Sequence, residues 1–122
     1  MKKITTAALF LMLTGTAFAQ EGRVGINTTD PKTTFDVNGK IDGSGNLLTT
    51  DITGMQAPRL TRAELTAKGN TLYGADQKGA LVFITDVSGG DATSQRKNIN
   101  KVGYYYFDGS VWQKMASASE AD

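Results

Sequence analysis

Apolar and polar residues alternate in two short stretches that follow the apolar N-terminus. Val24 and Ile26 are separated by glycine, and Phe35 and Val37 by aspartate. A period of two is typical of β-strands. The residues between the two stretches, 27–31, are Asn, Thr, Thr, Asp and Pro, which favour a turn. We therefore predict two very short strands joined by turns.

These two strands carry too few apolar side chains to enclose a core of their own. They must pack either against the later part of the chain or against the same segment of another chain. We favour the second alternative, in which the segments of three chains pack around a threefold axis. The predicted interface residues are Val24, Ile26, Phe35 and Val37.

A different pattern begins at residue 60. Thr61 and Glu64 have the spacing of a capping box, and Leu60 and Leu65 have the spacing of a hydrophobic staple. Gly69 supplies a left-handed stop. The pattern predicts a helix of about two turns, with the neighbouring Arg59 and Arg62 exposed to solvent.

Two further stretches predict a small antiparallel sheet. Ala80 to Ile84 is a continuous apolar run, typical of a strand that is buried on both faces. Tyr104 to Phe107 and Ser110 to Gln113 flank Asp108-Gly109, which is a two-residue hairpin signal. This register places Tyr105 opposite Trp112, and Tyr106 opposite Val111.

The predicted hairpin is aromatic on both sides. Tyr105, Phe107 and Trp112 share one side, and Tyr104, Tyr106 and Val111 share the other. We expect one side to pack on the helix and the other to meet a neighbouring subunit or a ligand. Because exposed aromatic rings can stack on sugars, an alternative is a carbohydrate-binding adhesive module. The residues proposed for that platform are Tyr104, Tyr106 and Trp112.

The N-terminus predicts export. Lys2 and Lys3 precede a short apolar segment, and Ala17-Phe18-Ala19 has the small-x-small pattern of a signal-peptidase site. Cleavage would leave 103 of the 122 residues, in the periplasm, at the cell surface or outside the cell. No apolar run reaches the roughly 20 residues that a membrane span requires, so we expect no membrane insertion.

Composition narrows the function. Loss of Lys2 and Lys3 changes the formal charge from +1 to −1, and the remaining basic residues are scattered, which argues against nucleic acid as a partner. The chain contains no His and no Cys, so the usual catalytic triads and zinc sites are excluded. We predict no enzyme activity, no cofactor and no metal.

The acidic residues of the first half are interpreted as turn residues. Asp30, Asp36, Asp42 and Asp51 each stand beside Gly, Pro, Asn or Thr, where short acids usually accept hydrogen bonds from local backbone. The spacing of Asp42 to Asn46 is similar to the first half of a calcium loop. The second half of that pattern is missing, so a flexible turn is favoured.

Several of these stretches resemble one family. Val24 to Pro31 followed by Phe35 to Gly39 is similar to the "VGIGTTNPxxxLDVNG" signature of phage tail-fibre-like and Bacteroidetes surface proteins, with Asn27 in place of Gly and Phe35 in place of Leu. Later segments resemble the "PRLT…GLLVYNTD…YYYDGTxW" module of the same proteins. The resemblance implies a fibrous, often trimeric, assembly. The chain departs from it in a polar insert at 87–101, which we interpret as a mobile loop.

The whole pattern predicts a mainly β (α+β) protein: a short N-terminal β stem, then a small antiparallel sheet with one two-turn helix. The predicted organisation is a signal peptide (1–19), a β-rich stem with a Gly-rich bridge (20–54), a small α+β module (55–115) and a polar tail (116–122). The predicted function is a non-catalytic, exported structural module of a homo-oligomer, expected to be a trimer. The alternative is the glycan-binding module.

Overall fold

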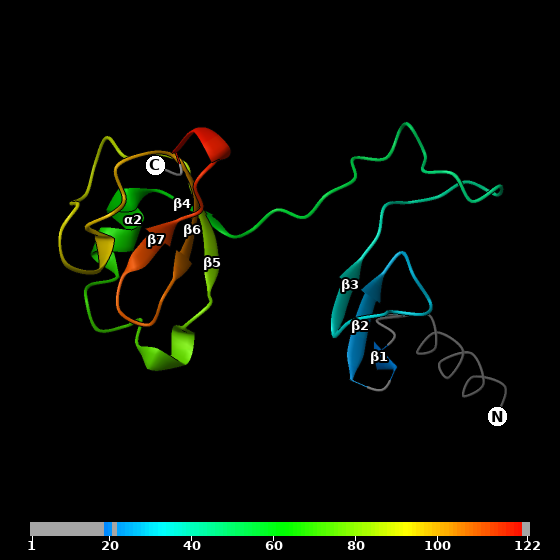
Figure 1. Ribbon diagram of the computed structural model, residues 1–122, viewed down its shortest axis with the longest axis horizontal. Helices are drawn as coiled ribbons and strands as arrows, with labels where there is room; N and C mark the ends of the chain where they lie inside the picture. Colours follow the sequence, from blue (N-terminus) through cyan, green and yellow to red (C-terminus); the bar gives the residue numbers. More distant parts are fainter. Residues whose placement is uncertain (1–18, 21, 121–122) are drawn as a thin grey trace, which may run out of the picture. The chain divides into compact units, whose positions relative to one another are not determined.

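The computed structural model describes residues 19–20 and 22–120, which form two compact units with a boundary between Met55 and Gln56 (Figure 1). Most of the predicted signal peptide lies outside the described residues. The chain is mostly strand, with small sheets and one short α-helix, which confirms the predicted fold class. In the described part of the chain, no helix has the length and apolarity needed to cross a bilayer.

The N-terminal unit contains a three-stranded sheet. Its strands are β1 (Ala19–Gln20), β2 (Arg23–Ile26) and β3 (Phe35–Val37), in that spatial order. β1 is antiparallel to β2, whereas β2 and β3 are parallel. The two predicted strands are therefore present, and segment 27–34 carries the chain back along β2 so that β3 runs in the same direction. Two hydrogen bonds link β2 to the residues on either side of β3. Val24 N donates to Thr34 O (2.7 Å), and Asn38 N donates to Ile26 O (3.0 Å).

A small hairpin follows β3 in the same unit. Ile41 and Leu47 form an isolated antiparallel bridge. The Asp42 carboxylate accepts hydrogen bonds from the backbone N–H groups of Ser44 (2.8 Å) and Asn46 (3.0 Å). The stretch with the calcium-like spacing is thus a turn in which Asp42 binds local backbone amides.

The C-terminal unit contains a four-stranded sheet of order β4-β5-β6-β7. Its strands are β4 (Arg59–Leu60), β5 (Leu81–Ile84), β6 (Gly103–Phe107) and β7 (Trp112–Lys114). β5, β6 and β7 are antiparallel, as predicted, but β4 pairs with β5 in parallel. The sheet is mixed because a helix lies between β4 and β5, and a helical crossover returns the chain in the same direction. Short 3₁₀ helices are η2 (Ala75–Gln77), η3 (Ser94–Arg96) and η4 (Ala118–Glu120).

The predicted helix is α2 (Arg62–Ala67), and its capping box is confirmed. Glu64 N donates to Thr61 Oγ1 (3.0 Å), and Thr61 N donates to Glu64 Oε1 (3.3 Å). Gly69 has a φ of +79°, the left-handed conformation that ends helices. The helix has six residues, so it is slightly shorter than two full turns.

The core of the C-terminal unit lies on one side of its sheet. Figure 1 shows α2 and the segment 87–101, in yellow, on the same side of the four strands. The buried side chains come from the helix, the sheet and that segment; they are Leu65, Val82, Ile84, Ile99, Tyr105, Phe107 and Trp112. The prediction that the last three share one side of the hairpin is confirmed.

The prediction that β5 is buried on both faces was wrong. Val82 and Ile84 are buried, whereas Leu81 is exposed and Phe83 is only half-buried. Helix α2 and its neighbouring loop cover one side of the sheet only, so the alternate residues of β5 lack a covering layer within this unit.

The predicted hairpin register was also wrong. Phe107 pairs with Trp112, and Tyr105 pairs with Lys114, so the connecting loop has four residues rather than two. The Asp108 carboxylate accepts hydrogen bonds from Ser110 N and Val111 N, both 2.8 Å, which stabilises the longer loop. Because the register moved by two residues, the side chains kept the sides of the sheet that the sequence predicts.

Candidate oligomerisation surfaces

Four apolar side chains gather on one side of the N-terminal sheet. The register pairs Val24 with Phe35 and Ile26 with Val37, and directly paired residues lie on the same side of a sheet. Phe35 is 53% exposed, Val24 and Ile26 are exposed, and Val37 is half-buried. The structure thus brings together the four predicted interface residues, here called the stem surface.

In the described part of the N-terminal unit, Pro31 and Gly39 are buried, but no large hydrophobic side chain is. Four of its other large apolar residues are exposed as well, Ile41, Leu47, Ile52 and Met55, whereas Leu48 is half-buried. Val37, Ile41 and Leu47 line a hollow of about 850 Å³. A short sheet without a covered side is marginally stable in water. The described residues of this unit thus leave apolar surface exposed.

A second apolar surface lies on the C-terminal sheet, on the side away from α2. The register aligns its members in two rows across the strands. One row consists of Arg59, Phe83, Tyr104 and, after the end of β7, Met115; the other consists of Leu81, Tyr106 and Gln113. Tyr104 and Tyr106 are 40% and 42% exposed. We call these seven residues the outer face.

Trp112 does not belong to the outer face. It is completely buried, with its ring 5.0 Å from that of Tyr73 and 5.2 Å from that of Phe107, both edge to face. The predicted platform of Tyr104, Tyr106 and Trp112 was therefore wrong. Trp112 is paired with Phe107, whose side chain faces the core, so the two tyrosines point away from it.

The outer face borders a small hollow. It measures about 120 Å³ and is lined by Gln56, Ala57, Arg59, Phe83 and Tyr104. The rings of Phe83 and Tyr104 lie 4.8 Å apart at an interplanar angle of 74°. Pockets for small organic ligands usually enclose about 300 Å³ or more, so this hollow is too small for such a ligand.

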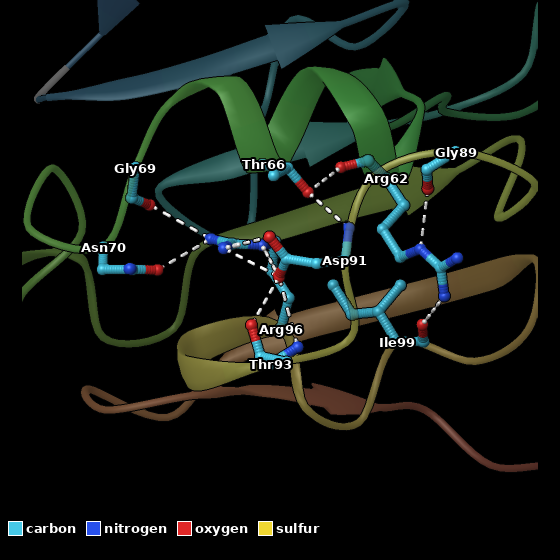
Figure 2. A network of polar contacts seen from close by, with 9 residues as sticks. All are labelled: Arg62, Thr66, Gly69, Asn70, Gly89, Asp91, Thr93, Arg96 and Ile99. Atoms are coloured by element: carbon cyan, nitrogen blue, oxygen red, sulfur yellow. Dashed lines mark hydrogen bonds and ion pairs between the residues drawn. The ribbon is translucent and has the colours of Figure 1, made fainter.

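The segment 87–101 is fixed to the helix by two arginines (Figure 2). Arg62, in the first turn of α2, donates from Nε to Gly89 O (2.9 Å) and from Nη1 to Ile99 O (2.9 Å). Its Nη2 donates to Val87 O. The expectation that Arg62 is merely solvated was wrong, because its guanidinium binds backbone carbonyls at both ends of the segment.

Arg96 provides the second attachment. Its side chain is buried and donates to the Asp91 carboxylate, to Gly69 O (3.2 Å) and to Asn70 Oδ1 (3.0 Å). In addition, Asp91 N donates to Thr66 Oγ1 (3.1 Å), as Figure 2 shows. The segment that the sequence suggests to be a mobile loop thus packs on the helix and contributes Ile99 to the core.

The acidic side chains serve mainly as hydrogen-bond acceptors for nearby groups. Backbone N–H groups at Val111 and Ser110, together with the Gln113 side chain, lower the pKa of Asp108 to about 2. Hydrogen bonds from local N–H and hydroxyl groups also lower the pKa of Asp42 and of Asp51. Asp36 accepts from Lys32 N (2.9 Å). Within residues 19–20 and 22–120, no three acidic side chains gather as a metal site would require.

Comparison with known proteins identifies one similarity. A family model described as "Phage tail like trimerisation region" matches residues 25–122. The match starts inside β2 and continues through the C-terminal unit. No curated protein and no solved structure gives a significant match.

Proposed function

The chain belongs to the family of phage tail like trimerisation regions, and from this premise we propose that it is a non-catalytic structural module that joins three copies of itself. The observation that carries the proposal is the stem surface. Its four apolar side chains share one side of a sheet, and the described residues of their unit leave all four at least partly exposed. In the trimer, three stem surfaces meet and exclude water from one another.

A homotypic contact suits the geometry of the stem. In a closed ring of three chains, each subunit meets one neighbour through one patch and the other neighbour through a different patch, and the side chains nearest the threefold axis come from all three chains. The strands are too short to cover their own apolar side, but three copies supply twelve side chains from the stem surface. The resulting assembly is fibre-like, with the stem as its associating part.

We further propose that the protein is exported. The support is the signal-peptide pattern that ends at Ala19. Mass spectrometry of the protein recovered from its native compartment should show a chain that starts at Gln20. Recovery of mature protein that still begins at Met1 would contradict export through a cleaved signal peptide.

The test of trimerisation is Ile26→Asp in the mature chain, examined by analytical ultracentrifugation and light scattering. The substitution places one carboxylate per chain in a shared apolar contact, and burial of an unpaired carboxylate costs several kcal/mol, on the order of 3 or more. We expect the wild type to sediment as a trimer and the variant to dissociate.

The matched control is Thr34→Asp, which adds the same charge at an exposed polar position next to β3. This variant should remain trimeric. A wild-type chain that is monomeric at micromolar concentration would contradict the proposed function. A trimer that is equally stable in both variants would contradict the role of the stem surface.

A further inference from the structure

The outer face of the C-terminal sheet has no covering layer among the described residues of its own unit. We infer that it is a second contact between copies of this chain, formed in the same trimer. This inference rests on the proposed trimerisation. It adds a separate surface, on a separate unit, to the association.

The extent of the family match is the first support. The similarity to a trimerisation region covers residues 25–122, and the C-terminal unit begins at Gln56. The matched region is therefore not confined to the stem. Because the sheet, the capped helix and the outer face all lie within it, the C-terminal unit belongs to the part of the chain that associates.

The exposure of the outer face is the second support. Its large apolar side chains Leu81, Tyr104, Tyr106 and Met115 are 36%, 40%, 42% and 52% exposed and lie on one side of one sheet. Contiguous exposed apolar side chains are typical of surfaces that meet another protein.

The composition of the outer face is the third support. The centres of protein interfaces are enriched in aromatic residues, Met and Arg, and are poor in acidic residues. The outer face contains Phe83, Tyr104, Tyr106 and Met115, and none of its seven members is Asp or Glu. Arg59, its one charged member, lies on the edge strand β4, where its guanidinium can remain at the polar rim.

A second copy of the chain suits this surface better than a sugar does. Stacking on a sugar needs a broad ring face, whereas Phe83 and Tyr104 meet edge to face at 74°. The adjoining hollow of about 120 Å³ is too small for an oligosaccharide. Trp112, the largest aromatic side chain, is buried on the other side of the sheet.

The absence of cysteine from the sequence permits a direct test. Tyr106→Cys and Leu81→Cys each place a single thiol on the outer face. Lys68→Cys is the matched control, because Lys68 is exposed at the end of α2, on the opposite side of the sheet. Circular dichroism and sedimentation of each variant establish that it is folded and show its oligomeric state. A short bis-maleimide and a maleimide dye then report cross-linking and thiol accessibility.

We expect both outer-face thiols to cross-link between chains and to react with the dye at least tenfold more slowly than Cys at position 68. Folded trimers in which all three thiols react equally fast, without cross-links at 81 or 106, would overturn the inference but leave trimerisation intact. Monomeric wild type would overturn the proposed function itself. Binding of the wild-type trimer to an immobilised glycan array, abolished by Tyr106→Ala, would overturn the inference in favour of sugar stacking.

Discussion

The guanidinium of Arg96 holds both carboxylate oxygens of Asp91, five residues earlier in the chain. Nη2 lies 2.9 Å from Oδ1 and 3.2 Å from Oδ2, and Nε lies 3.1 Å from Oδ1. The Arg96 side chain is 4% exposed and that of Asp91 is 40% exposed, so the pair connects the interior to the surface. Since Arg96 also binds Gly69 O and Asn70 Oδ1, it fastens the loop to the end of α2.

We predict that Arg96→Ala destabilises the C-terminal unit by about 2 kcal/mol, because its partners would lose charge-assisted hydrogen bonds and two of them lie next to the helix end. Lys97→Ala, at the exposed neighbouring position, should change stability by no more than about 0.5 kcal/mol. Urea denaturation of both variants measures the difference. Indistinguishable midpoints would show that Arg96 does not hold the loop.

Acid should weaken the β6–β7 hairpin through Asp108. Its pKa is lowered to about 2 in the folded chain, from an ordinary value of 3.8. A lowered folded pKa stabilises the protein above the unfolded pKa, and this contribution is lost as the pH falls through the folded value. We therefore predict that the thermal midpoint falls between about pH 4 and pH 2, and falls less in Asp108→Asn.

The control for this titration is Asp76→Asn, at an exposed position in η2. It should follow the pH dependence of the wild type, which also includes other aspartates with lowered pKa, such as Asp86 and Asp91. If Asp108→Asn retained the whole wild-type slope, the hydrogen bonds to the Asp108 carboxylate would not contribute to acid sensitivity.

Local patterns of the sequence predicted local structure well. The capping box of Thr61 and Glu64 involves residues three apart, and the stop at Gly69 depends on one backbone conformation. The aromatic residues of β6 and β7 alternate with period two, so their division between the core and the outer face followed from the sequence. These patterns depend on residues that are close in the sequence, so the predictions made from them were correct even though the predicted hairpin register was wrong.

Long-range contacts could not be predicted in the same way. Arg62 reaches carbonyls 25 to 37 residues away, and no spacing in the sequence marks such a contact. The same limit applies to Arg96, whose burial depends on the loop folding over α2. The hairpin register failed for a different reason: Asp108-Gly109 matches a two-residue turn, but the carboxylate of Asp108 stabilises a four-residue loop.

The helix cap gives a simple stability test. Thr61→Ala removes the hydroxyl that accepts from Glu64 N, and loss of an N-cap side chain costs about 1 kcal/mol. Lys68→Ala, at the exposed end of α2, should cost little. We expect urea denaturation to give a lower free energy of unfolding for Thr61→Ala than for Lys68→Ala. Equal free energies of unfolding would mean that the capping box contributes nothing measurable.

Asn27 directly follows β2 and has a left-handed backbone conformation. Its φ is +56°, in the left-handed region that glycine adopts freely and asparagine tolerates better than most residues. Its Nδ2 donates to Asn38 O (3.1 Å), which ties the start of the connection to the residue after β3. The side chain thus offsets part of the backbone strain at this position.

We therefore predict that Asn27→Gly keeps the trimer, with stability changed by no more than about 0.5 kcal/mol, since relief of strain opposes the lost hydrogen bond and the greater entropy of the unfolded chain. Asn27→Val should cost about 1–2 kcal/mol or more, because a β-branched residue is strained at this φ. It should also weaken association, since segment 27–34 sets the pairing of β2 with β3. Thr29→Val is the control in the same turn. Among the described residues other than glycine, Asn27 and Ser94 have a positive φ and Thr29 does not, so valine at position 29 meets no such strain. If Asn27→Val matched Thr29→Val in thermal denaturation and in sedimentation, the left-handed turn would not set the geometry of the stem.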